Sequence, residues 1–242
     1  GRVEVVPTAH YFMGGVVVDT DTRTALPGLY VAGEDAGGAH GANRLGGNGV
    51  ANSTVYGGIA GDVMGRDIAG QRQLREPDEA VLSAEIERAM APVGRSGGNI
   101  HELRRNLQDV MWDDVGVIRT ADGMTRALDR LDGIESALME TGVAGESLAF
   151  NLTWHDWLNM RSLVDISKII TRAGLARENS RGAHYREDFP EVGALEGSYF
   201  TQARMAGDDI EVTRAPVAFT IVKPGESILP DGAPDTLVAA AE

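Results

Sequence analysis

The sequence predicts an α+β fold, in which a glycine-rich segment with short strands precedes an antiparallel helical bundle and a short β segment. Nearly half of the 31 glycines lie within the first 66 residues. Further along, apolar residues recur at helical spacing, and between residues 210 and 222 they alternate as in a strand or hairpin. These changes of pattern predict three parts, at residues 1–66, 67–223 and 224–242.

The first part carries the strand signals. Short strands are expected at Val3 to Val6 and at Val16 to Asp19, and a buried strand at Leu29 to Gly33. Glu34 follows the last of these, at the strand end where open α/β sheets bind ligands. A helix is expected from about Asn48 to Met64, although each of its glycines costs about 1 kcal/mol relative to alanine. Close approach to another element or a ligand would explain them.

The second part reads as helices that pack on one another. After a polar connector at about 66–78, three apolar stripes mark helices near residues 81–90, 103–111 and 124–138. The longest pattern runs from about Leu148 to Arg177 and has a wide apolar face. This arrangement is typical of an antiparallel bundle. The tail from Pro224 is rich in proline, glycine and alanine.

Composition excludes several classes of function. The 242 residues include 36 acidic and 22 basic side chains, and the resulting charge of −14 opposes binding to nucleic acid or anionic lipid. Without cysteine the chain can hold no thiolate metal site or cysteine-ligated iron–sulfur cluster of its own, and no metal site is predicted. Because no apolar run reaches the roughly 20 residues that span a bilayer, direct membrane insertion is not expected.

The most informative run is His40-Gly-Ala-Asn-Arg-Leu-Gly-Gly-Asn48, thirty residues after His10. It sets a cation and hydrogen-bond donors on glycine-rich backbone. Arginine suits the binding of a small carboxylate, because its planar fork donates two charge-assisted hydrogen bonds and stays charged. On residue type alone Arg44 could instead pair with one of the many acids, and His10 could be an ordinary surface residue. His40 either orders the loop or contacts the ligand.

Four motifs resemble, in the same order, the C-terminal part of succinate dehydrogenase and fumarate reductase flavoprotein subunits. They are His10-Tyr-Phe-Met-Gly-Gly15, Leu26-Pro-Gly-Leu-Tyr-Val-Ala-Gly-Glu34, the run from His40 to Asn48, and Ser180-Arg-Gly-Ala-His-Tyr-Arg-Glu-Asp-Phe-Pro190. L-aspartate oxidase belongs to the same superfamily, but Leu45-Gly46-Gly47 favours the succinate and fumarate branch. The first part is therefore expected to be the C-terminal piece of a flavin-binding α/β domain, and the chain a C-terminal portion of a longer protein.

The resemblance implies the residues that bind the substrate. His10 matches the histidine that binds one substrate carboxylate. Arg44 matches the arginine that grips a dicarboxylate beside the flavin, which makes it the expected catalytic residue as well.

The resemblance also implies FAD as the cofactor. Glu34 matches the acidic residue that accepts hydrogen bonds from FAD hydroxyls, although it could merely cap the turn that follows its strand. Asn48, Gly49 and Val50 fall where the helix start meets the flavin, with Gly49 in a place where the family commonly has serine. A helix N-terminus there would bring partial positive charge and free N–H groups to the flavin.

The implied activity is interconversion of succinate and fumarate, or of a similar dicarboxylate, by hydride transfer with flavin N5. No Gly-x-Gly-x-x-Gly cradle for the FAD diphosphate is present. In the family that cradle and the proton relay lie upstream, so the chain alone is expected to be inactive. Two other interpretations stay open. The first is an L-aspartate oxidase or another dicarboxylate oxidase, and the second is a non-catalytic helical docking module.

The expected partners follow from the same resemblance. They are a dicarboxylate substrate, the N-terminal FAD-binding part of the protein, and an iron–sulfur subunit. The expected location is the cytoplasm, or the periphery of the inner membrane through a partner subunit.

Overall fold

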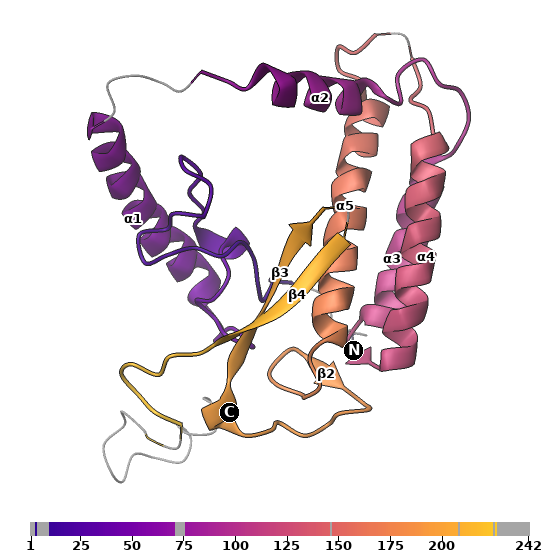
Figure 1. The fold of residues 1–242 in the computed structure, drawn as a ribbon. Helices are drawn as coiled ribbons and strands as arrows, with labels where there is room; N and C mark the ends of the chain where they lie inside the picture. Colours follow the sequence, from indigo (N-terminus) through magenta and orange to yellow (C-terminus); the bar gives the residue numbers. More distant parts are fainter. Residues whose placement is uncertain are drawn as a thin grey trace. The chain divides into compact units, whose positions relative to one another are not determined.

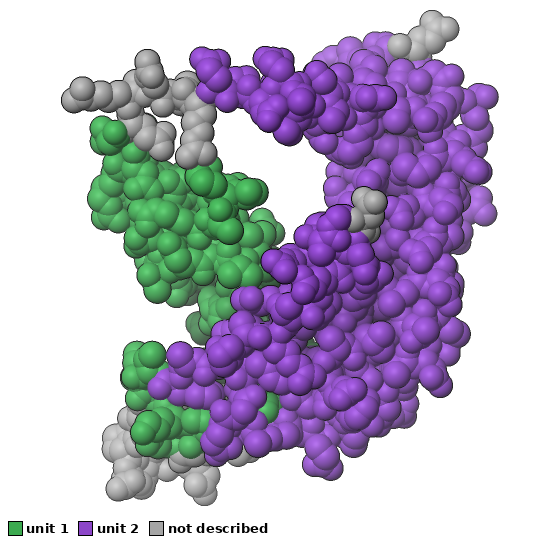
Figure 2. All heavy atoms as spheres, in the orientation of Figure 1, with its two compact units in different colours: residues 1–75, 181–183, 220–242 green, residues 76–180, 184–219 purple. Residues whose placement is uncertain are grey.

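The chain is mostly helical, with two small sheets. The computed structural model describes residues 3, 10–70, 76–145, 147–207, 209–224 and 226. They belong to two units, which Figure 2 shows in different colours. Unit 1 consists of residues 1–75, 181–183 and 220–242, and unit 2 of residues 76–180 and 184–219. No helix in the described part is long and apolar enough to cross a membrane.

Three long helices form the core of unit 2 (Figure 1). They are α3 (Ile100–Val115), α4 (Ala121–Glu140) and α5 (Leu152–Leu175). Apolar side chains from all three meet in one buried cluster, as the helical spacing predicted. Inside that cluster the fully buried indole of Trp157 donates a 2.9 Å hydrogen bond to the carbonyl of Leu138, which ties α5 to α4. The predicted bundle is confirmed.

Each α-helix of unit 2 begins at a side chain that caps it. The side chains of Asp78, Asn99, Thr120 and Asn151 accept hydrogen bonds from backbone N–H groups in the first turns of α2 (Glu79–Met90), α3, α4 and α5. Such caps satisfy donors that have no partner within the helix. Helix α2 differs from the others because none of its residues is buried.

The C-terminal end of α5 is closed by a buried arginine. Arg186, which is 1% exposed, donates hydrogen bonds to the carbonyls of Gly174, Leu175 and Arg177. Its other nitrogens pair with both carboxylate oxygens of Asp188 at 2.7 and 2.8 Å, and this pairing lowers the pKa of Asp188 to about 2. The carboxylate thus compensates the buried charge while the guanidinium satisfies the last carbonyls of the helix.

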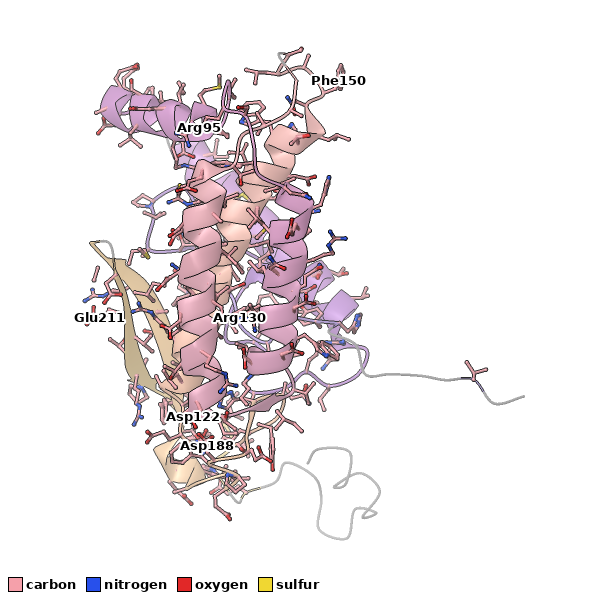
Figure 3. All side chains as sticks on the ribbon, turned by 90° about the vertical axis from the view of Figure 1, so that its right-hand side faces the viewer. Arg95, Asp122, Arg130, Phe150, Asp188 and Glu211 are labelled. Atoms are coloured by element: carbon pink, nitrogen blue, oxygen red, sulfur yellow. The ribbon has the colours of Figure 1, made fainter. Side chains whose placement is uncertain are left out.

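Asp188 also reaches the next element. Its carboxylate accepts a 2.8 Å hydrogen bond from the backbone N–H of Ala121. Figure 3 accordingly shows Asp188 beside Asp122, in the first turn of α4. Through this carboxylate one ion pair joins the end of α5 to the beginning of α4.

His184 lies in the same region as a neutral side chain. Its Nδ1 is 2.9 Å from the Arg119 guanidinium, which can only donate, so Nδ1 accepts and Nε2 carries the proton. Nε2 in turn donates to the carbonyl of Arg177 at 3.2 Å. Burial, aided by the charge of Arg119, lowers the pKa of His184 to about 4.

Two small sheets complete unit 2. β3 (Tyr199–Ala206) and β4 (Asp209–Pro216) form an antiparallel hairpin, and β1 (Ile118–Arg119) pairs in parallel with β2 (Tyr185–Arg186). The predicted strand at 210–222 is confirmed in its first part, as β4. Its partner β3 precedes it, and the sequence pattern did not reveal β3 or the two-residue strands.

Unit 1 contains α1 (Asn48–Gly70) and the short 3₁₀ helix η1 (Gly33–Asp35). The helix predicted from about Asn48 is confirmed and runs six residues beyond Met64. Its glycines at 57, 58, 61 and 65 face open space within the described part of the chain, so no close approach there accounts for them.

The strands predicted in unit 1 are wrong in extent. Val16 forms only an isolated bridge to Ala36, and Tyr30 only an isolated bridge to Arg23. Leu29, expected to be buried, is 44% exposed. Glycines with positive φ next to these bridges interrupt the extended backbone that a ladder needs. Except for Val3, the strand predicted at 3–6 lies outside the described residues, as does the tail beyond 226.

Replacing the buried indole should unfold unit 2 more easily. We expect Trp157→Ala to lower the free energy of unfolding by about 3–5 kcal/mol, because it leaves a cavity in the core. Trp112, which is 62% exposed, offers a matched control, and Trp112→Ala should cost less than about 0.5 kcal/mol. Urea unfolding followed by circular dichroism measures both. Equal losses would contradict the assignment of Trp157 to the core.

Acid should destabilise the protein through His184. Its pKa is about 4 in the folded state, below its ordinary value of 6.5, so the unfolded chain binds more protons between these pH values. Stability should therefore fall as the pH drops from 6.5 towards 4. Asp188 adds a loss only at lower pH, because its pKa is about 2.

The urea midpoint measured across this pH range tests the role of His184. In His184→Gln the dependence on pH should be shallower than in the unchanged protein, and in His101→Gln, which replaces an exposed histidine, it should stay the same. If the urea midpoint of His184→Gln depends on pH as steeply as that of the unchanged protein, His184 is not the cause of the acid destabilisation.

Candidate functional site

Glycines bring two segments of unit 1 together. Val16 donates to the carbonyl of Asp35 at 2.8 Å, and Gly37 donates to the carbonyl of Val16 at 2.9 Å. A Cβ on Gly15 would lie 2.2 Å from the Asp35 oxygen, and a Cβ on Gly37 would lie 2.9 Å from the Gly15 oxygen. Only glycine allows this approach, which sets the segment after His10 beside η1.

Glu34 joins the same two segments. It is exposed on η1, and its Oε1 accepts a 2.8 Å hydrogen bond from the backbone N–H of Phe12. This bond crosses 22 positions of sequence. Its own short helix begins without a side-chain cap, so the structure does not use Glu34 as a cap for the turn.

Arg44 and His40 both pack on the ring of Tyr11. The Arg44 guanidinium carbon lies 4.5 Å from the ring centroid, a cation–π contact. The His40 ring meets Tyr11 edge-on, with centroids 5.4 Å apart. Nε of Arg44 and Nε2 of His40 are buried without a hydrogen-bond partner in the described part of the chain. His10, the neighbour of Tyr11, is exposed.

Helix α1 begins against this ring. A Cβ on Gly49 would lie 3.0 Å from the ring carbon Cε2 of Tyr11 and 3.4 Å from Nη1 of Arg44. Asn48 and Val50, on either side of Gly49, are exposed, Val50 by 79%. The first N–H groups of a helix lack intrahelical partners and carry partial positive charge. The start of α1 thus offers donors next to Arg44.

One turn into α1, a buried amide fixes the arrangement. Asn52 is 6% exposed, and its Nδ2 donates to the Tyr11 hydroxyl at 3.1 Å and to the carbonyl of Gly33 at 3.2 Å. It shares the buried face of α1 with Ala60 and Val63. The amide therefore ties α1 to both the Tyr11 segment and η1.

A second network braces the other end of α1. Both nitrogens Nε and Nη2 of Arg23 donate to the Asp67 carboxylate, which also accepts a 2.6 Å hydrogen bond from the Tyr30 hydroxyl. These hydrogen bonds, that of Arg23 foremost, lower the pKa of Asp67 to about 2. The brace holds the 19–30 loop on α1.

The structure brings together most of the residues singled out in the sequence. Arg44 and Gly49 contact Tyr11, Glu34 bonds to the residue after Tyr11, and His10 precedes it. Sequence reasoning missed Tyr11 and Asn52. The available signal for Asn52 was its spacing to Ala60 and Val63, which marks one face of the helix. No cluster of residues suited to a metal ion occurs in the described part.

Two protein families match the chain. Residues 104–228, slightly more than half of the 242, match the C-terminal region of the fumarate reductase flavoprotein. Residues 2–50 match an FAD binding domain.

Relatives of these families are similar over much of the chain. One component of the CoM/CoB fumarate reductase of Methanothermobacter marburgensis is 38% identical over 193 residues, which cover 78% of this chain and 34% of that protein. L-aspartate oxidase of Yersinia pestis is 36% identical over 193 residues, covering 78% and 33%. The chain spans about a third of the length of the curated relatives it matches.

A solved structure has the same fold. The Mycobacterium smegmatis Sdh1 structure in complex with UQ1 contains a chain that is 35% identical, with a TM-score of 0.77. The similarity covers 86% of this chain and 35% of that one.

The close approach at Gly15 can be tested by comparison with Gly28, where a side chain would meet no neighbouring atoms. Gly15 and Gly28 both have positive φ, but a Cβ on Gly28 meets nothing within 4 Å. We expect Gly28→Ala to cost about 1–2 kcal/mol for the left-handed backbone alone. Gly15→Ala should cost at least about twice as much, since it also pushes η1 away. Urea unfolding compares the two, and equal costs would contradict the tight bridge.

Proposed function

Because the chain belongs to the succinate dehydrogenase and fumarate reductase flavoprotein family, to which L-aspartate oxidase is related, we propose that its full-length flavoprotein interconverts succinate and fumarate. Arg44 carries the proposal. Its guanidinium lies at the start of α1, and no carboxylate of the described chain pairs with it. A free, oriented guanidinium is suited to a substrate carboxylate.

We propose that FAD binds beside Arg44, as the FAD binding domain match at residues 2–50 supports. The residues present suit it. Glu34 offers a carboxylate for ribityl or ribose hydroxyls, while Asn48, Gly49 and Val50 offer the donors of an exposed helix start. When bound, FAD supplies the site that accepts or gives the hydride.

The chain's own residues would bind and orient the substrate. Arg44 would donate two parallel hydrogen bonds to one carboxylate, and exposed His10 would donate to the other. The fixed positive charge of Arg44 would also stabilise negative charge that develops on the substrate during hydride transfer. Holding both carboxylates limits the substrate to orientations in which the reacting carbons can approach the flavin.

Partners and location are part of the same proposal. The family resemblance supports electron exchange with an iron–sulfur subunit, and a location in the cytoplasm or at the inner membrane through that partner. The chain by itself is proposed to be inactive, since the FAD diphosphate cradle and the proton relay belong to the upstream part of the family's sequence.

A second activity would use the same carboxylate-binding residues. The 36% identity to L-aspartate oxidase supports oxidation of L-aspartate, another four-carbon dicarboxylate. Assays of the full-length flavoprotein with succinate, fumarate and L-aspartate distinguish the two activities. Turnover of L-aspartate alone would replace our proposal with the oxidase.

The alternative of a non-catalytic docking module has its own test. It measures the FAD content and the succinate turnover of the purified chain. Tight FAD binding with turnover would eliminate the docking module, and would equally contradict our proposal that the chain alone is inactive.

Removing the guanidinium of Arg44 should abolish most activity of the full-length flavoprotein. Loss of a charge-assisted carboxylate pair costs about 2–5 kcal/mol, so Arg44→Ala should lower kcat/KM about 30- to 5,000-fold. Arg66→Ala, which removes an exposed arginine of α1, should leave it within about twofold. Steady-state kinetics with fumarate and a reduced dye measure both variants. Activity kept by Arg44→Ala would overturn the proposal.

A further inference from the structure

Tyr11 lies at the centre of the site without a role in the proposed reaction. We infer that Tyr11 is a positioning residue that fixes the Arg44 guanidinium for the dicarboxylate, with Asn52 holding the ring and Gly49 leaving space for it. The inference rests on the proposed function, in which Arg44 binds a substrate carboxylate. It adds a residue whose effect is exerted through Arg44.

The ring is the contact that holds Arg44. Three other arginines stack on aromatic rings in the described part, and each of them also donates hydrogen bonds to protein oxygens: Arg177, Arg186 and Arg214. The Arg44 guanidinium, 4.5 Å from the Tyr11 centroid, has no such hydrogen bond or ion pair among the described residues. The π face therefore orients this cation while its Nη donors stay available to a ligand.

The ring itself is fixed on its other sides. Asn52, which is buried, donates to the Tyr11 hydroxyl at 3.1 Å and prevents the ring from swinging out. The His40 ring packs edge-on, at an interplanar angle of 84°. Because these neighbours hold the ring, the ring leaves Arg44 little freedom to lose when a dicarboxylate binds.

Gly49 makes the stack sterically possible. A Cβ at this position would lie 3.0 and 3.3 Å from ring carbons of Tyr11, and 3.4 Å from Nη1 of Arg44. A side chain here would require the ring or the guanidinium to shift by a few tenths of an ångström. Gly46, in the same loop, has nothing within 4 Å of its would-be Cβ and lacks this constraint.

The test uses the full-length, FAD-loaded flavoprotein and the dicarboxylate malonate as probe. Tyr11→Leu removes the π face and should raise the malonate Kd and the KM for fumarate at least about tenfold, with FAD content unchanged. Tyr11→Phe keeps the face and should restore both to within about threefold. Tyr56→Leu, on the same unit, is the matched control and should change neither.

A double-mutant cycle separates positioning from a general structural effect. If Tyr11 acts through Arg44, Arg44→Ala should weaken malonate binding much less in the Tyr11→Leu background than in the unchanged protein. Should Tyr11→Leu fail to fold, Gly49→Ala tests the same geometry and should raise the malonate Kd, while Gly46→Ala should not. Additive effects, or full malonate affinity in Tyr11→Leu or Gly49→Ala, would overturn the inference.

If the proposed function itself is wrong, the experiment gives a result that differs from failure of the Tyr11 inference. In that case the unchanged flavoprotein turns over neither succinate nor fumarate, whatever stands at position 11. Turnover that depends on Arg44 but not on Tyr11 would contradict only the inference that Tyr11 positions Arg44.

Discussion

The contact between the start of α1 and the ring of Tyr11 is the constraint on which the site depends. The absence of a side chain at Gly49 leaves room for this contact, which brings a helix N-terminus, a stacked guanidinium and the segment after His10 to one place. Asn52 extends the contact by one helical turn, since its amide bonds to both Tyr11 and η1. Helix α1 is thereby both a structural support and one wall of the candidate site.

The glycines of unit 1 have two different uses. Gly15 and Gly37 allow two backbones to touch, and positive φ at Gly15 turns the chain there. Each such glycine costs conformational entropy on folding and shortens the ladder that a strand needs. Gly15 and Gly37 thus prevent a regular strand at Val16, which is why an isolated bridge replaces the expected strand there.

The helices were predictable because local and tertiary signals agree. Apolar spacing marks the buried faces, and capping side chains such as Asn99 and Thr120 mark the starts. The short strands were not predictable, since strands of two residues such as β1 and β2 are too short to show an alternating pattern. In the site, Arg44 and Glu34 were found through motifs, whereas Tyr11 and Asn52 act through tertiary contacts between segments about forty residues apart. Nothing in the local sequence states that these segments meet.

The acidic surplus of the chain does not oppose a dianionic ligand at this place. A net charge of −14 acts over distance, but at physiological ionic strength exposed charges are largely screened beyond about 8 Å. A bound ligand is therefore affected mainly by the charges within about 8 Å of it. Arg44 keeps its full charge because an uncharged ring, instead of a carboxylate, holds it, and the start of α1 adds partial positive charge beside it. If an acid held the same guanidinium in place of Tyr11, the position would be kept, but the charge that we propose binds a carboxylate would already be neutralised.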